Sequence, residues 1–187
     1  DLMTQRNGNP HRGSHILAIE ASEDYENARD RVVEFINARE REEVIFTRNS
    51  TESMNLIAHS YGLHNVKKGD KIVITVAEHH ANLVTWQYVA EQTGATLEYM
   101  YLDEHGHLKD GEINKIDENT KIVAFAHVSN VLGMEFPVKE LTEKARSVGA
   151  IVVLDGAQST PHKKIDVQAL DCDFFVFSGH KMCASQG

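Results

Sequence analysis

The sequence has few cysteines, no long apolar run and no cluster of basic residues. Its two cysteines, Cys172 and Cys183, form no CxxC pair, so neither a zinc site nor a disulfide framework is expected. Such sparse use of cysteine fits the cytoplasm or an organelle with a reducing interior. No apolar run approaches the roughly 18 residues of a membrane-spanning helix, and no signal peptide is recognisable. We therefore expect no membrane association.

The charge balance argues against a nucleic-acid partner. The formal net charge is −9, and neither a basic run nor a pattern of stacking aromatic residues is present. No metal site is expected either, because the adjacent histidines His79 and His80 have no evident third ligand. Apolar residues make up 41% and charged residues 25% of the 187 residues, which is ordinary for a globular protein with one buried core.

Apolar runs alternate with amphipathic stretches along the chain. Short runs rich in β-branched and aromatic residues predict strands at 44–46, 71–75, 97–102, 121–126, 151–154 and 174–177. Apolar residues at helical spacing predict helices at 22–38 (with Ser22 as N-cap), from 48–52 to Tyr61, at 82–93, near 113–116 and at 137–148. This alternation predicts an α/β fold with a mainly parallel sheet and helices on both faces.

Polar side chains follow the last two predicted strands. The first group is Asp155 with Gln158, and the second is Ser178, His180 and Lys181. In open α/β sheets, ligands bind at the carboxyl ends of the strands. A lysine amine can form a Schiff base with an aldehyde, and a buried carboxylate keeps a pyridine nitrogen protonated, so Asp155 and Lys181 together suit pyridoxal 5'-phosphate (PLP). The alternative is that Asp155 caps a turn and Lys181 is an ordinary solvated lysine.

The turn between the predicted strand at 44–46 and the following helix is a candidate anion site. Free backbone N–H groups and the helix dipole favour a phosphate there. Ser50 and Thr51 can add hydroxyl donors. The alternative is an ordinary helix N-cap.

Further motifs occur in order along the chain. They are Asn9-Pro10-His11-Arg12-Gly13, Phe35-Ile36-Asn37-Ala38, Glu78-His79-His80-Ala81-Asn82, His127-Val128-Ser129-Asn130-Val131-Leu132-Gly133 and Asp166-Val167-Gln168-Ala169-Leu170-Asp171-Cys172-Asp173. Together with the polar groups at the strand ends, they resemble the class V aminotransferases, a family of PLP enzymes, and most nearly the cysteine desulfurases of the SufS group. The resemblance covers nearly all of the chain. It implies the large domain of a type I PLP-dependent transferase, incomplete here, with an N-terminal arm at 1–20, a partial PLP-binding domain at 21–187 and an absent C-terminal small domain.

The resemblance also implies a role for each candidate residue. Lys181 and His79 would be catalytic, Lys181 by binding PLP and moving protons and His79 by stacking on the cofactor ring. Asp155 would hold the pyridinium and Gln158 the ring hydroxyl. The other implied contacts are Ser50, Thr51, Ser178 and His180 with the phosphate, Asn130 with the cofactor hydroxyl and the substrate carboxylate, and Arg12 with the substrate across a dimer interface.

The implied activity is that of a PLP-dependent cysteine desulfurase in sulfur metabolism. L-cysteine would become L-alanine, and the sulfur would pass through an enzyme persulfide to an acceptor protein for iron–sulfur cluster assembly. A homodimer is implied as well. The alternatives are another class V enzyme, such as a selenocysteine lyase or an amino-acid epimerase or transaminase, and a non-catalytic fragment or interaction module.

The chain departs from the family pattern at several positions. Asn49 replaces the usual glycine, and its tolerance of left-handed backbone should preserve the turn. Residues 184–186 replace part of the usual Gly-Pro-Thr-Gly. Neither Cys172 nor Cys183 matches the family's persulfide-forming cysteine. We therefore expect a fragment that lacks the nucleophile and is inactive by itself.

Overall fold

The computed structural model describes residues 8–184. These residues belong to two compact units, one ending at Phe46 and the other beginning at Thr47. Residues 1–7 of the predicted arm, and the departures from the family pattern at Ser185 and Gln186, lie outside the described residues. The predicted division of the chain at residue 20 stays a prediction.

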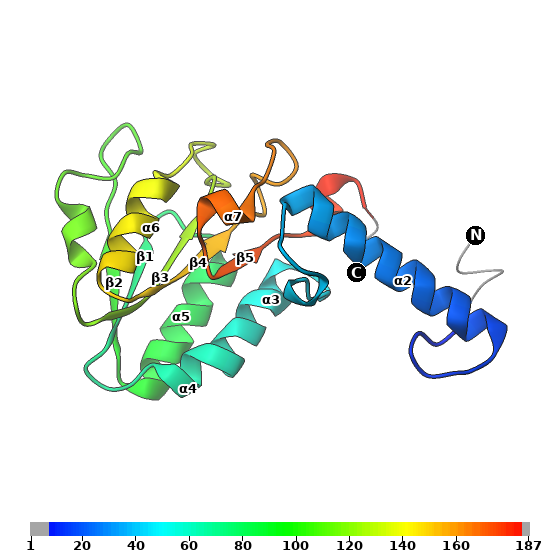
Figure 1. Ribbon diagram of the computed structural model, residues 1–187. Helices are drawn as coiled ribbons and strands as arrows, with labels where there is room; N and C mark the ends of the chain where they lie inside the picture. Colours follow the sequence, from blue (N-terminus) through cyan, green and yellow to red (C-terminus); the bar gives the residue numbers. More distant parts are fainter. Residues whose placement is uncertain (1–7, 185–187) are drawn as a thin grey trace. The chain divides into compact units, whose positions relative to one another are not determined.

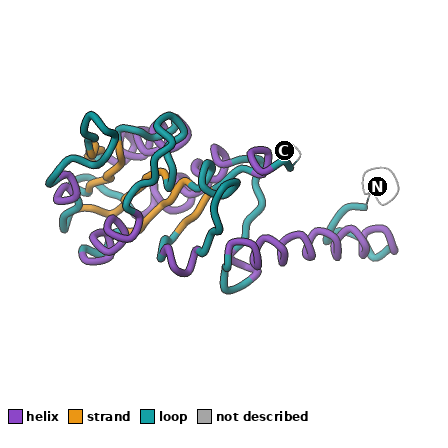
Figure 2. Tube along the Cα trace, turned by 90° about the horizontal axis from the view of Figure 1, so that it is seen from above, coloured by secondary structure: helices purple, strands orange, loops and turns teal. Residues whose placement is uncertain are grey.

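The first unit is built on one long helix, α2 (Ile16–Ile36; Figures 1 and 2). The helix begins where His15 Nδ1 accepts a hydrogen bond of 3.3 Å from the Ala18 N–H, and it ends at Asn37, which has a left-handed φ of 54°. The predicted start at Ser22 is therefore wrong. Ser22 lies inside the helix, where its hydroxyl donates to the Ala18 carbonyl at 2.7 Å.

The predicted strand at 44–46 does not form. Arg29 of α2 donates to the Val44 carbonyl, and the Phe46 ring meets the Tyr25 ring edge-on with 5.3 Å between centroids. Contacts with side chains of α2 thus take the place of strand pairing. The β-branched and aromatic composition favoured extended backbone, which by itself does not supply a partner strand.

The second unit contains a five-stranded sheet in which all neighbouring strands are parallel (Figure 1). In spatial order the strands are β2 (Thr96–Met100), β1 (Lys71–Thr75), β3 (Thr120–Ala126), β4 (Ile151–Asp155) and β5 (Phe174–Val176). The five strands predicted beyond residue 70 are confirmed, with small differences at their ends. The predicted fold class is confirmed as well.

Helices cover both faces of this sheet (Figure 1). Alternate side chains of β1 enter different apolar clusters, Ile72 and Ile74 on one face and Val73 on the other. Each fully buried side chain of this kind contributes about 1.5–3 kcal/mol relative to exposure. The first cluster is completed by α3 (Ser50–Ile57), the π-helical turn η2 (Ala58–Gly62), α4 (Leu63–Asn65) and α5 (His80–Thr93), and the second by α6 (Val138–Ser147).

The remaining elements are short. They are the 3₁₀ helices η1 (Arg41–Glu43), η3 (Glu112–Lys115) and η4 (Gly179–Met182), and the α-helix α7 (Val167–Leu170). The predicted helix near 113–116 is thus a single 3₁₀ turn. Within residues 8–184, no helix has both the length and the apolar character needed to cross a membrane.

The parallel pairing brings several strand ends to one edge. Ala126, the last residue of β3, pairs with Asp155, the last residue of β4, and Asp155 pairs in turn with Val176 of β5. Loop and helix residues that directly follow these strands therefore meet at the carboxyl edge of the sheet, where open α/β folds bind ligands.

Gly156 directly follows β4, and its lack of a side chain is required by packing. A Cβ at this position would lie 2.0 Å from Cζ of Phe175. We expect Gly156→Ala to lower the free energy of unfolding by about 1–3 kcal/mol, and Phe175→Leu added to it to recover part of the loss. Urea unfolding of both single variants and the double variant measures the coupling. Strictly additive effects would show that Phe175 is not the obstacle.

Candidate functional site

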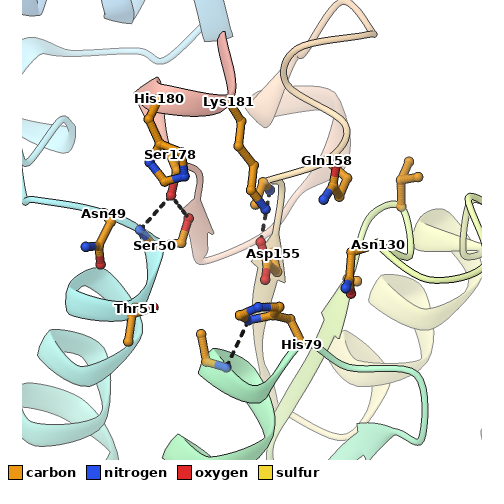
Figure 3. A pocket seen from close by; sticks show the side chains of 14 residues that line it. Asn49, Ser50, Thr51, His79, Asn130, Asp155, Gln158, Ser178, His180 and Lys181 are labelled. Atoms are coloured by element: carbon orange, nitrogen blue, oxygen red, sulfur yellow. Dashed lines mark hydrogen bonds between the residues drawn. The ribbon is translucent and has the colours of Figure 1, made fainter. Parts of the chain in front are cut away.

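A cavity of about 200 Å³ lies at the carboxyl edge of the sheet (Figure 3). All the predicted site residues line it except Arg12. They are Ser50, Thr51, His79, Asn130, Asp155, Gln158, Ser178, His180 and Lys181. These side chains come from segments far apart in sequence, and the strand ends and the start of α3 bring them together.

Five further residues line the cavity that were not among the predicted site residues. Asn49 and the small or apolar residues Ala81, Ala126, Val128 and Ala157 also line the cavity. Short apolar side chains carry no chemistry that a search for functional groups would detect. Their contribution is to leave space at the edge of the sheet.

Arg12 belongs to the first unit, where it lies exposed in a turn before α2. Its backbone N–H donates to the Asn9 carbonyl at 3.3 Å. The role implied for it in substrate binding stays a prediction.

Asp155 is the buried acid of the cavity, with 6% of its surface exposed. Its Oδ1 accepts a hydrogen bond of 2.9 Å from the Ala157 N–H. Burial raises the pKa of the Asp155 carboxyl, while this hydrogen bond and the positive charges of Lys181 and His79 act in the opposite direction. The ionised carboxylate is therefore incompletely compensated, and a cation bound beside it would stabilise it.

Lys181 approaches Asp155 from the short helix η4, which follows β5. Its backbone N–H donates to the Ser178 carbonyl at 3.1 Å, which forms the turn. Figure 3 shows the Lys181 side chain directed toward Asp155. His180, on the same turn, also borders the cavity. An amine and a buried carboxylate thus share one cavity.

The start of α3 forms a third side of the cavity. The Ser50 N–H donates to the Ser178 hydroxyl at 2.9 Å, and the two hydroxyls are hydrogen-bonded at 2.7 Å. Asn49 is the N-cap, and its Oδ1 accepts from the Glu52 N–H at 3.0 Å. The expected left-handed backbone at Asn49 is wrong, because its φ of −171° is extended and open to any residue.

His79 is the N-cap of α5. Its Nδ1 accepts a hydrogen bond of 3.1 Å from the Ala81 N–H. In the neutral ring the proton is therefore on Nε2. Figure 3 shows the ring beside Asp155, so the helix start holds the imidazole at the cavity wall.

Asn130 and Gln158 come from loops. The loop of Asn130 is closed by an antiparallel bridge between Val128 and Glu135 and by a 2.9 Å hydrogen bond from the Ser129 N–H to the Met134 carbonyl. Gln158 lies half-buried in the turn after β4. Both amides border the cavity opposite the start of α3 (Figure 3).

Glu78 is a further functional candidate, to which the sequence motifs assigned no role. It is half-buried, and its carboxylate accepts hydrogen bonds from Thr75, Asn82 and the Ala126 N–H. Burial raises the pKa of Glu78 to about 7, with the charge of Asp155 acting in the same direction. In the sequence it is the first residue of the motif Glu78-His79-His80-Ala81-Asn82 and an acid between a strand end and a helix start. The second pattern is also common in ordinary turns, and neither pattern assigned a role to the carboxylate.

The sequence matches a known protein family over its whole length. The family model described as Aminotransferase class-V matches residues 1–187. A probable cysteine desulfurase of Halalkalibacterium halodurans is 54% identical over 188 residues, which cover 100% of this chain and 46% of the relative. A cysteine desulfurase of Haloferax volcanii is 53% identical over 184 residues, which cover 97% of this chain and 43% of the relative.

A solved structure has a fold similar to that of this chain. The apo structure of a cysteine desulfurase from Thermococcus onnurineus NA1 superposes with a TM-score of 0.90 at 44% identity, covering 96% of this chain and 44% of that one. The chain therefore spans less than half the length of the curated relatives it matches.

The raised pKa of Glu78 has a consequence for stability. The folded chain keeps a proton that the unfolded chain releases between about pH 4.5 and about pH 7, so the free energy of unfolding falls as the pH rises through this window. Glu78→Gln cannot titrate. We expect the stability of the wild type relative to Glu78→Gln to fall by roughly 3 kcal/mol across the window, at about 1.4 kcal/mol per pKa unit.

Urea unfolding at several pH values measures this difference. Glu91→Gln is the matched control, since Glu91 is an exposed residue of the same helix, α5. Its stability relative to the wild type should stay constant with pH. A constant difference for Glu78→Gln as well would contradict the raised pKa.

Proposed function

The chain belongs to the class-V aminotransferase family, and we propose that it forms the cofactor-binding part of a PLP-dependent cysteine desulfurase. The observation that carries the proposal is the meeting of Asp155, Lys181 and the start of α3 around one cavity. The relatives named cysteine desulfurase support the reaction class.

The residues present fit PLP, which has an aldehyde, a pyridine nitrogen and a phosphate. The Lys181 amine suits the aldehyde. Among residues 8–184, no cation fully compensates the buried carboxylate of Asp155, which therefore suits a protonated pyridine nitrogen. Bound there, the cofactor would supply the electron sink for breaking bonds at the substrate's α-carbon.

The phosphate would bind at the start of α3. Backbone N–H groups at a helix N-terminus and the helix dipole favour an anion. Ser50 and Thr51 would contribute from α3, and Ser178 and His180 from the segment after β5. The Ser178 hydroxyl already hydrogen-bonds with Ser50, so a phosphate oxygen would join an existing polar cluster.

The remaining cavity residues would orient the cofactor ring and the amino acid. Asp155 would hold the pyridinium, Gln158 the ring hydroxyl, and His79 one face of the ring. Asn130 would bind near the cofactor hydroxyl and the substrate carboxylate. Lys181 would hold the cofactor. Its Nζ would then take a proton from the substrate's α-carbon and later return it.

The finer assignment rests on the sequence motifs that resemble the SufS group. We propose the SufS group, L-cysteine as substrate with L-alanine as product, and transfer of the sulfur to an acceptor protein for iron–sulfur cluster assembly. We also propose a homodimer in which Arg12 reaches the partner's site, and a cytoplasmic location. The alternative is another class V enzyme, such as a selenocysteine lyase, because the same cofactor residues would serve it.

Neither cysteine of this sequence is proposed to take up the sulfur. Cys172 is half-buried, and burial raises the pKa of its thiol to about 12, so almost none is thiolate at neutral pH. Cys183 is exposed and, like Cys172, is not among the residues that line the cavity. Both thiols therefore fit structural or incidental roles.

The cofactor assignment is tested by reductive trapping. Borohydride treatment of the chain with PLP should fix the label on Lys181, because that amine faces the buried carboxylate. Peptide mass mapping locates the label. Lys181→Ala should abolish it, and Lys164→Ala, at an exposed lysine of the same unit, should not. A label on another lysine would refute the assignment.

The reaction is tested in the whole protein with L-cysteine. We expect alanine and sulfide in the presence of a thiol reductant, and unchanged rates in a Cys172→Ser and Cys183→Ser double variant. A loss of about tenfold or more on the double replacement would contradict the exclusion of these thiols. Racemised or transaminated product without sulfide would favour another class V reaction.

A further inference from the structure

Glu78 lies between the end of β1 and the start of α5, and it contacts Ala126, which lines the cavity. It is not among the residues that line the cavity. The roles proposed above leave it unused. Even so, its carboxylate accepts hydrogen bonds from three different elements.

The three donors belong to β1, β3 and α5. One oxygen, Oε1, accepts from the Thr75 hydroxyl and, at 3.2 Å, from the Ala126 N–H. The other, Oε2, accepts from Asn82 Nδ2 at 2.7 Å. Asn82 is itself fixed, because its Oδ1 accepts from the indole N–H of the buried Trp86 at 2.6 Å. The carboxylate therefore connects two strand ends to the first turn of a helix.

Both connections lead to residues that face the cavity. His79 directly follows Glu78 and is the N-cap of α5. On the other side, Ala126 lines the cavity and pairs in register with Asp155. The His127 N–H, next along the chain, donates to the Asp155 carbonyl at 2.8 Å. Moving the Glu78 carboxylate would thus move the support of both the imidazole and the buried acid.

We propose that Glu78 is a positioning residue for the cofactor ring: its carboxylate fixes the first turn of α5, which presents His79, against the end of β3, which lies beside Asp155. This inference rests on the proposed function for its ligand. When ionised, Glu78 also adds a second negative charge behind Asp155, which favours a cationic ring in the cavity.

The charged groups around Glu78 determine how this effect depends on pH. Asp155 on β4 raises the pKa of Glu78. On α5 the neighbouring titratable groups are His79 and His80, and across the cavity Lys181 faces Asp155. The end of β3 contributes His127, whose ring pairs with Glu135 at 3.2 Å. Asp155 is thus the like charge to which Glu78 is coupled.

The first experiment measures PLP affinity of the chain at about pH 6 and about pH 8.5. We expect Glu78→Gln to bind about tenfold more weakly than the wild type at the higher pH, the change that one pKa unit of interaction produces. The ratio of the wild-type affinity to the Glu78→Gln affinity should be smaller at the lower pH, where wild-type Glu78 carries its proton. Glu78→Asp keeps the charge but is one methylene too short to reach all three donors, so it should lose affinity at both pH values. Glu91→Gln is the matched control.

A merely structural role would lower the melting temperature and leave the ratio of affinities independent of pH. That result would overturn the proposal. Affinities of Glu78→Gln and Glu78→Asp equal to that of Glu91→Gln would overturn it as well. In both cases PLP binding by the wild type would still support the proposed function. If Glu78→Gln fails to fold, Glu78→Asp decides alone: unchanged affinity would overturn the positioning role.

The second experiment needs no cofactor. Carboxyl ¹³C NMR should give a Glu78 titration midpoint of about 7 in the wild type, lowered in Asp155→Asn because the like charge is gone and unchanged in Glu91→Gln. An unchanged midpoint in Asp155→Asn would refute the link between the two acids. If the wild type does not bind PLP, the proposed function is refuted, and the positioning role loses its proposed ligand. This titration would still decide whether Glu78 and Asp155 are coupled.

Discussion

The parallel register of β3 with β4 is the constraint on which the second unit depends. It ends both strands at the same level, with Ala126 paired to Asp155. A parallel sheet covered on both faces has no solvated side, so its strands stay apolar along their length and polar groups collect beyond their ends. The start of α3 reaches the same edge through the buried hydrogen bonds between Ser50 and Ser178. The chemistry of the cavity therefore arises from strand ends that the fold aligns.

Electrostatics at this edge favour a bound cation. Asp155 and Glu78 are both partly or fully removed from water, and burial raises the pKa of each. For Glu78, three hydrogen bonds offset only part of that desolvation. For Asp155, the hydrogen bond from the Ala157 N–H and the positive charge of Lys181 likewise offset only part. A protonated ring in the cavity would interact with both acids at once. The same interactions that bind the ring would then keep it protonated, which is the state that its chemistry requires.

The two units differ in how far local pattern determined their structure. In the second unit each predicted strand formed, and those at the centre of the sheet, β1, β3 and β4, are largely buried. In the first unit the run at 44–46 packs against Tyr25 and Arg29 of α2 and has no strand partner. The N-cap of α2 is His15 and not the predicted Ser22, whose hydroxyl forms its hydrogen bond within the helix. Where the periodicity of the sequence is weak, the secondary structure was determined by the contacts that the segment can make.

The sequence by itself determined the α/β class, the strands of the sheet and the polar residues that follow them, because continuous apolar runs and their polar ends are local properties of the chain. Only the tertiary structure decided which of these residues share a cavity, that Asn49 caps α3 with extended backbone, and that Gly156 must pass the Phe175 ring. It also decided the environment of Glu78, whose hydrogen bond from the Ala126 N–H joins residues far apart in sequence. Such contacts depend on the register of whole strands, and no local pattern of side chains encodes that register.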